Sequence, residues 1–193
     1  MGDFGDFVDD YYRRFVKVLE TFDRAPMEGV LEVLDRVRDS GGTVWVAGNG
    51  GSAAIADHTA CDATKGGHVE GQPPLRIISL NSNVAMLTAL SNDFGYQDVY
   101  RRQLDYYLKP GDAVLFVSSS GDSPNVVEAC RHARDLGIPT IAFVGFGGGA
   151  LRELAEHVVW VPVDNCGIAE DTHQSLMHVI SQYLFARGEG PDS

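Results

Sequence analysis

The stretch Thr43–Ser52, TVWVAGNGGS, joins an apolar run to a turn that is rich in glycine. Its first five residues show no regular alternation of apolar and polar side chains, which is typical of a strand buried on both faces of a parallel sheet. The glycines then allow a sharp turn that presents backbone N–H groups at the start of a helix. The stretch therefore predicts a strand, a tight turn and a helix, the unit that repeats in α/β folds.

Four further apolar runs have the length of buried strands. They are Leu75–Leu80, Ala113–Ser118, Thr140–Val144 and Val158–Val163. Helical patterns cover 7–22 and 26–40, and then 52–64, 84–90 with a continuation to 108, 124–136, 150–156 and 168–187. Strands that alternate with helices in this way predict an α/β fold with a doubly wound, five-stranded parallel sheet flanked by helices.

The length and composition fit one domain. We expect N-terminal helices over 1–40, an α/β core over 43–187 and a tail over 188–193, within 193 residues in all. The formal net charge of −12 argues against nucleic acid or an anionic membrane as a partner. Three cysteines without C-x-x-C spacing, and an amino terminus without an apolar run, favour the reducing cytoplasm.

The glycine turn Gly48–Ser52 has three interpretations. It suits a phosphate group, because free N–H groups at a helix start bind anions. Through Ala53 it also imitates the dinucleotide pattern G-x-G-x-x-A, but that site requires an acidic residue after the next strand, where Asn81-Ser82-Asn83 stands. A tight turn that binds no ligand is the third interpretation.

A second phosphate loop is predicted at Ser118–Ser123, SSSGDS, which follows a buried run and precedes Pro124. Four hydroxyl groups beside a helix amino terminus can surround a phosphate without any net charge. The alternative is a cluster that caps the helix, which needs only one serine, so the excess favours phosphate binding. Gly145–Gly149 carries no hydroxyl and is interpreted as a loop.

Histidines and carboxylates on two predicted helices are candidate metal ligands. His58 and Asp62 are four residues apart, which places them about 40° apart on one helix face. Glu170 and His178 are eight apart, about 80° by the same geometry, and His173 is a substitute for either. Such a set suits zinc or another divalent first-row metal, whereas a surface ion pair is the alternative for His58 and Asp62.

Four motifs occur in one order along the chain: GNGGSAA-x-AxH from Gly48, LSNDFGY at Leu90–Tyr96, SSSGDS from Ser118, and E-D-x-H-x-x-x-x-H at Glu170–His178. With these motifs the chain resembles the phosphoheptose isomerases of the SIS family over nearly its whole length. The resemblance implies a SIS-type fold with an N-terminal helical hairpin, and a homotetramer with active sites between subunits. It also implies an enzyme of heptose biosynthesis that converts sedoheptulose 7-phosphate to D-glycero-D-manno-heptose 7-phosphate.

The resemblance also assigns site residues. It implies that the phosphate is held by Ser52, Ser118, Ser119, Ser120 and Ser123. Further candidates for substrate binding are Asn49, Gly50, Gly51, Lys65, Asn92 and Asp93. The implied ligands of the divalent metal, which we expect to be zinc, are His58, Asp62, Glu170 and His178.

The implied catalytic residues are Asp62 as the base and His178 as the acid, with Glu170 as an alternative base. Asp93 matches a position near the active site of the family, although capping of the following helix is an equal interpretation. The family normally has Glu at position 62, Gln at 170 and Asn at 122. Asp122 is therefore expected to bring a negative charge towards the phosphate.

Three functions follow from these observations. The first is the metal-dependent isomerase, which moves a proton between neighbouring carbons through an enediol. The second is a SIS module without catalytic activity that binds a sugar phosphate or a protein partner, as the departures at Asp62 and Glu170 allow. The third is an isomerase of another phosphosugar, suggested by the unusual loop at Gly66–Pro74.

Overall fold

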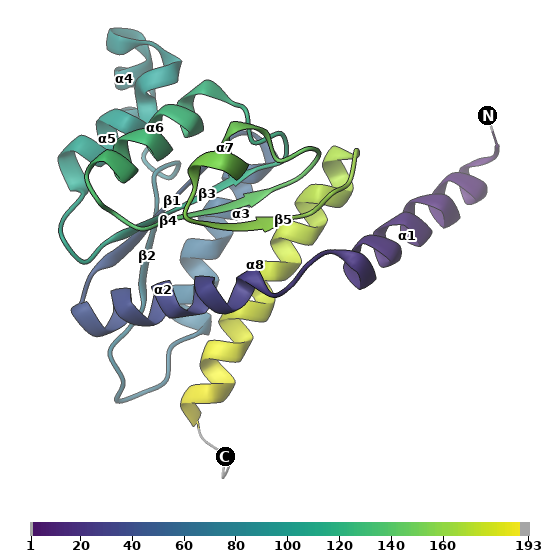
Figure 1. Cartoon of the computed structure of the whole chain (residues 1–193), viewed down its shortest axis with the longest axis horizontal. Coiled ribbons are helices and arrows are strands. Elements are labelled where there is room, and N and C mark those ends of the chain that lie inside the picture. The colour runs from purple at the N-terminus through teal and green to yellow at the C-terminus, as the bar shows by residue number, and fades with distance from the viewer. Residues whose placement is uncertain (1, 190–193) are drawn as a thin grey trace.

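The computed structural model describes residues 2–189, which form a layered α/β structure (Figure 1). One parallel sheet contains all five strands in the order β2-β1-β3-β4-β5. The strands are β1 (Thr43–Gly48), β2 (Arg76–Ser79), β3 (Ala113–Ser118), β4 (Thr140–Val144) and β5 (His157–Trp160). The predicted doubly wound sheet is confirmed.

The helices precede, connect and follow these strands. They are α1 (Phe4–Thr21), α2 (Pro26–Ser40), α3 (Gly51–Cys61), α4 (Val84–Phe94), α5 (Val99–Tyr107), α6 (Pro124–Asp135), α7 (Gly149–Leu154) and α8 (Cys166–Glu189). A π-helical turn, η1 (Asp62–Gly66), follows α3, and a 3₁₀ turn, η2 (Tyr96–Asp98), follows α4. None of the helices within residues 2–189 has the length and apolar character that a membrane span requires.

Several boundaries differ from the sequence prediction. The continuous helix expected up to residue 108 is interrupted at Gly95, whose φ of 91° only glycine adopts readily. The last strand ends at Trp160 rather than Val163, because Pro162 has no N–H group for a strand ladder. The helix α8 continues through Gly188 and Glu189, which were expected in the tail. Residues 190–193 of that tail lie outside the described residues.

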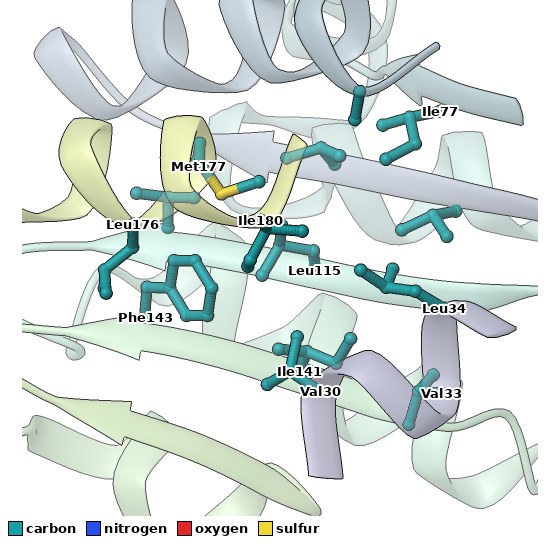
Figure 2. Packing of buried hydrophobic residues seen from close by; sticks show 14 of the residues in the cluster. Val30, Val33, Leu34, Ile77, Leu115, Ile141, Phe143, Leu176, Met177 and Ile180 are labelled. Atoms are coloured by element: carbon teal, nitrogen blue, oxygen red, sulfur yellow. The ribbon is translucent and has the colours of Figure 1, made fainter. Parts of the chain in front are cut away.

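Helices cover both faces of the sheet. On one face α2 and α8 pack against β3 and β4; Figure 2 shows Val30, Val33 and Leu34 from one side meeting Leu115 and Ile141, and Met177 and Ile180 from the other. On the opposite face Tyr100 and Leu104 of α5 pack with Val114 and Phe116 of β3. Each such buried aliphatic or aromatic side chain stabilises the fold by about 1.5–3 kcal/mol.

The two N-terminal helices are present as predicted, but α1 points away from α2 instead of packing along it (Figure 1). The contacts of α1 are with α8. Tyr11 donates a hydrogen bond to Asp171 at 2.7 Å, and Phe15 and Val18 pack against a small cluster that contains Ile168. The pKa of Tyr11 is raised to about 12, chiefly by the hydrogen bond to the Asp171 carboxylate.

Asp112 is a buried carboxylate, 4% exposed, at the amino-terminal end of β3. It accepts hydrogen bonds from Thr43 N at 2.8 Å, Trp45 Nε1 at 3.0 Å and Lys109 N at 3.0 Å. Three donors, one of them the buried indole N–H of Trp45, therefore depend on one side chain, which ties the start of β1 to the turn before β3.

We predict that Asp112→Ala lowers the free energy of unfolding by about 3 kcal/mol, because it leaves the buried Trp45 N–H and two part-buried backbone N–H groups without acceptors. Urea unfolding followed by circular dichroism measures this loss. The substitution Asp135→Ala, at an exposed position, is the control and should cost less than about 0.5 kcal/mol. Equal midpoints for the two variants would contradict the role assigned to Asp112.

Candidate functional site

The candidate site lies where the strand order reverses. The chain passes from β1 to β2 on one side and later to β3 on the other, so the carboxyl ends of β1 and β3 border a crevice. In open α/β sheets this position is where ligands bind. Both predicted phosphate loops, Gly48–Ser52 and Ser118–Ser123, begin at these strand ends.

The two loops enclose one hollow with a volume of about 310 Å³, which we call the serine pocket. Its lining consists of Asn49, Ser52, Ser118, Ser119, Ser120, Ser123, Phe146, Cys166 and Glu170. All five serines that the resemblance assigned to the phosphate are among these residues. The structure thus brings together hydroxyl groups that are more than sixty residues apart in the sequence.

The glycines of the first loop allow its close approach to the surrounding backbone. Gly50 has a φ of 55°, a conformation that side chains disfavour. A Cβ atom on Gly48 would lie 2.6 Å from Ser52 O, and one on Gly51 would overlap the Glu170 carboxylate. The tight turn therefore requires glycine at positions 48 and 50, and a side chain at position 51 would displace the Glu170 carboxylate.

The serine hydroxyl groups of the second loop differ in their partners. Ser118 Oγ accepts from Gly121 N at 3.0 Å and so shapes the loop. Ser119 Oγ is buried and has no hydrogen-bond partner within residues 2–189. Ser123 precedes α6, but its side chain makes no capping bond. Capping therefore does not account for this cluster, and the Ser119 hydroxyl remains available to a ligand.

Asn49 is held by a network that the sequence analysis missed. Its Oδ1 accepts from Tyr96 OH at 2.8 Å and from Asn125 Nδ2 at 2.9 Å, and its own Nδ2 donates to Asn125 Oδ1 at 2.8 Å. Tyr96 belongs to the LSNDFGY motif, which was the available signal. Nothing in the sequence pattern marked Asn125.

Asp122 does not line the serine pocket. Its Oδ1 accepts from Ala150 N at 2.7 Å, in the first turn of α7. The amino terminus of a helix favours a negative charge, which gives this carboxylate a structural partner away from the pocket. The Asp122 carboxylate, which we expected to approach the phosphate, is therefore bound to the start of α7 instead.

Three of the four proposed metal ligands come together at a second place, which we call the histidine cluster. His58 Nε2 lies 3.0 Å from His178 Nε2, and Asp62 Oδ2 lies 3.1 Å from the first and 3.3 Å from the second. Donor atoms bound at 2.0–2.1 Å to a tetrahedral zinc ion are about 3.3 Å apart. These three residues could hold a metal ion, and their nitrogen and oxygen donors suit first-row metals.

The backbone changes its winding where Asp62 stands. The helix α3 ends at Cys61 and continues as the π-helical turn η1, in which Gly67 N donates to Asp62 O at 2.9 Å. Such turns insert one residue into a helix and occur often at functional sites. The Asp62 carboxylate nevertheless stays on the same side as His58, four residues earlier.

The structure places Glu170 apart from the histidine cluster. Its carboxylate lies against Gly51 and lines the serine pocket. Burial, and then the charge of Asp171, raise the pKa of Glu170. Glu170 and His178 are eight residues apart, about 12 Å along α8, and Glu170 is not among the donors that converge within the described residues. The assignment of Glu170 as a fourth ligand stays a prediction.

His173 is enclosed in the core and does not reach the histidine cluster. It is 0% exposed, and its ring lies 6.3 Å from that of Phe143. Neither ring nitrogen has a hydrogen-bond partner among the described residues. Burial lowers the pKa of His173 to about 4, so the imidazole is neutral at pH 7. The interpretation of His173 as a substitute ligand is wrong for this chain.

The remaining candidates are exposed. Asn92 and Asp93 lie near the end of α4, where Asn92 Nδ2 donates to Asp93 Oδ1 at 2.9 Å. The following turn, η2, begins after Gly95 without a side-chain cap, so capping by Asp93 is wrong. Lys65 lies exposed in η1. The structure connects none of the three, through contacts within residues 2–189, to the serine pocket or the histidine cluster.

We predict that His173 makes folding sensitive to acid. The unfolded chain binds a proton at this residue near pH 6.5, whereas the folded chain does so only near pH 4. Stability should fall as the pH drops through this window, by about 2 kcal/mol between pH 7.5 and pH 5. His173→Phe should flatten this part of the pH profile.

Urea midpoints at the two pH values measure the effect. His68→Gln is the matched control, because His68 is exposed and should leave the slope unchanged. If the free energy of unfolding of His173→Phe falls between pH 7.5 and pH 5 as much as that of the unmodified protein, the prediction is contradicted.

Comparisons with known proteins agree with this fold. A model of the SIS domain family matches residues 7–145. A probable phosphoheptose isomerase of Thermoplasma acidophilum is 38% identical over 79% of this chain and 83% of its own. A phosphoheptose isomerase of Mycobacterium tuberculosis is 37% identical over 84% of both chains.

The solved structures include a phosphoheptose isomerase from Neisseria gonorrhoeae with a TM-score of 0.87 at 25% identity. It covers 95% of this chain, and this chain covers all of it. The similarity therefore extends over the sheet, both pocket-forming loops and α8.

Proposed function

We propose that this chain, which belongs to the SIS domain family and within it to the phosphoheptose isomerases, interconverts sedoheptulose 7-phosphate and D-glycero-D-manno-heptose 7-phosphate. The observation that carries the proposal is the position of two different sites on one pair of helices. The serine pocket lies at the start of α3 and the histidine cluster at its end.

The distance between the two sites supports a seven-carbon substrate. On α3, Ser52 and His58 are six residues apart, which is about 9 Å along the helix axis. On α8, Glu170 and His178 are about 12 Å apart along the axis. An extended chain advances about 1.2 Å per bond, so C1 of a heptulose lies about 10 Å from the phosphorus of a 7-phosphate. A five-carbon substrate would be about 2.5 Å too short to reach both sites.

In this proposal the phosphate binds in the serine pocket. Hydroxyl groups of Ser119 and Ser120 and the N–H groups at the start of α3 donate to its oxygens. These groups have no net charge, which suits a protein with a formal charge of −12. They fix one end of the sugar and leave C1 and C2 at the histidine cluster.

The histidine cluster would hold a divalent ion, which we propose to be zinc, through His58, Asp62 and His178. Its chemical contribution when bound is to polarise the oxygen atoms of the sugar. We assign the carbon-to-carbon proton transfer to Asp62: Oδ2 faces the imidazoles, so Oδ1 remains free to take a proton from C1 and return it at C2. The second proton passes from the O1 hydroxyl of the sugar to its C2 oxygen, which completes the exchange of ketose and aldose. His178 Nε2 can carry an ion or a proton, but not both at once, so the metal-bound enzyme uses it as a ligand.

We predict a separation of roles between the two sites. Asp62→Asn should lower kcat by at least about a thousandfold while phosphate binding is kept, because the proton acceptor is lost. Ser120→Ala should raise the KM for the sugar phosphate several-fold with a smaller change in kcat. His178→Ala should lower kcat by a similar factor to Asp62→Asn and should also keep phosphate binding.

The assay uses purified protein with zinc and sedoheptulose 7-phosphate, with the product identified by NMR. Calorimetry with inorganic phosphate gives binding separately. Absence of turnover in the unmodified, zinc-loaded protein would reject the isomerase, and parallel losses in Asp62→Asn and Ser120→Ala would reject the division of roles.

We predict that Glu170→Gln tightens phosphate binding several-fold at pH 8. The pKa of Glu170 is raised by burial but the carboxyl still ionises as the pH rises, and a carboxylate in the serine pocket repels an anion. Phosphate affinity of the unmodified protein should therefore fall with rising pH. In Glu170→Gln, the decrease of phosphate affinity that this carboxylate causes at high pH should be absent.

The measurement is calorimetry with inorganic phosphate at pH 5.5 and pH 8. Asp135→Asn serves as the control, because Asp135 is exposed on α6 and does not line the serine pocket. The same pH dependence in Glu170→Gln and in the unmodified protein would contradict a direct effect of Glu170.

We further propose a cytoplasmic homotetramer in which a second subunit completes the site. The three cysteines are unpaired, in keeping with a reducing compartment. The side chains of His58 and His178 are 45% and 43% exposed, more than is usual for a site that excludes water. Large apolar side chains of α1, Phe4 and Phe7 among them, are also exposed and suited to a subunit contact.

A binding module without catalytic activity is the second candidate. The position of Glu170 favours such a module, because without Glu170 the histidine cluster has only three protein ligands among the described residues. The side chain of Asp62 is also shorter than the glutamate that the family normally has at this position. The isomerase is preferred because the three donor atoms already converge. Tight sugar-phosphate binding without turnover in the presence of zinc would support the module instead.

A further inference from the structure

The loop Gly145–Gly149, between β4 and α7, forms one wall of the serine pocket. Gly145 N donates to Ser119 O at 3.0 Å, and Leu151 N donates to Gly121 O at 3.0 Å. A Cβ atom on Gly149 would lie 2.5 Å from Ser120 O. The glycines therefore let this loop lie directly on the serine loop, which makes it more than a connection between two elements.

Phe146 stands in the middle of this loop in an unfavourable backbone conformation. Its φ of 42° makes it the one non-glycine residue with a positive φ among residues 2–189. A bulky side chain rarely adopts this region, and residues that do so cluster at ligand sites. Such a conformation persists only where the surroundings enforce it.

Two hydrogen bonds enforce the conformation of Phe146. Its N–H donates to Val163 O at 3.1 Å, and its carbonyl oxygen accepts from Trp160 Nε1 at 2.9 Å. The guanidinium of Arg152 stacks 3.6 Å from the centroid of the Trp160 ring and fixes that indole in turn. Phe146 could leave the left-handed region only by breaking these bonds.

Phe146 is the one aromatic residue in the lining of the serine pocket. Near it stands the buried Ser119 hydroxyl, which has no partner within the described chain. An apolar wall excludes water, and hydrogen bonds to an anion are stronger where water is excluded. The strained loop therefore puts an aromatic residue in the pocket lining, where its ring would strengthen the binding of a charged group.

We propose that Phe146 is a substrate-binding residue that closes the serine pocket around the phosphoryl group, with Trp160 and Arg152 as its positioning residues. This inference rests on the proposed function only in taking a phosphoryl group as the ligand. In this proposal the strained backbone of Phe146 serves the binding of the phosphoryl group and does not stabilise the fold.

Two substitutions at one position separate the ring from the strain. Phe146→Ala removes the ring but keeps a side chain at positive φ, whereas Phe146→Gly removes both. Both variants should raise the Kd for inorganic phosphate and the KM for sedoheptulose 7-phosphate by about tenfold, with kcat changed less than about threefold. Phe146→Gly should melt about 2–4 °C above Phe146→Ala, because its backbone is unstrained.

A double-mutant cycle tests the role of Trp160. Trp160→Phe loses the indole N–H that holds the Phe146 carbonyl but keeps a ring for Arg152, and should weaken phosphate binding by about threefold. In the Phe146→Gly background this effect should vanish, since Trp160 acts through Phe146. Equal effects in both backgrounds would overturn the positioning role.

Phosphate binding by Phe146→Gly at the strength of the unmodified protein would overturn the proposal. The absence of any phosphate binding to the unmodified protein would overturn it as well, because no anion would then occupy the pocket. If the unmodified protein binds phosphate but does not isomerise the sugar, the proposed function fails and the role of Phe146 stands.

Discussion

The contact between α3 and α8 is the constraint on which the rest of this site depends. At one end of the contact Gly51 lies against Glu170, and at the other His58 lies against His178. The two helices thus run side by side in the same direction between the serine pocket and the histidine cluster. Because helices are stiff, their rise fixes the distance between a bound phosphate and the reacting carbons.

The sheet positions these two helices. The strand β1 leads directly into the glycine turn and α3, and Leu176, Met177 and Ile180 hold α8 on the same face of the sheet (Figure 2). The neighbouring strand, β3, leads into the serine loop, so polar groups from both loops meet where the strand order reverses. Burial of apolar side chains beneath the site is therefore what keeps its polar groups in register.

The strands and helices could be predicted because their apolar periodicity is local. The run at Ala113–Ser118 and the helix from Pro26 to Ser40 have the same bounds in the sequence prediction and in the structure. The meeting of His58 with His178, 120 positions apart, could not follow from spacing and came from the resemblance to a family. The direction of Glu170 and the strained backbone of Phe146 depend on tertiary contacts that no local pattern encodes. The single-domain organisation stays a prediction.

The most direct test of this account compares kcat/KM for substrates of different length. The zinc-loaded protein is assayed with sedoheptulose 7-phosphate and with a five-carbon ketose 5-phosphate under the same conditions. We expect at least about a hundredfold preference for the seven-carbon substrate, because the shorter sugar cannot reach both sites. Equal values of kcat/KM for the two sugars would contradict the claim that α3 and α8 set the length of the substrate.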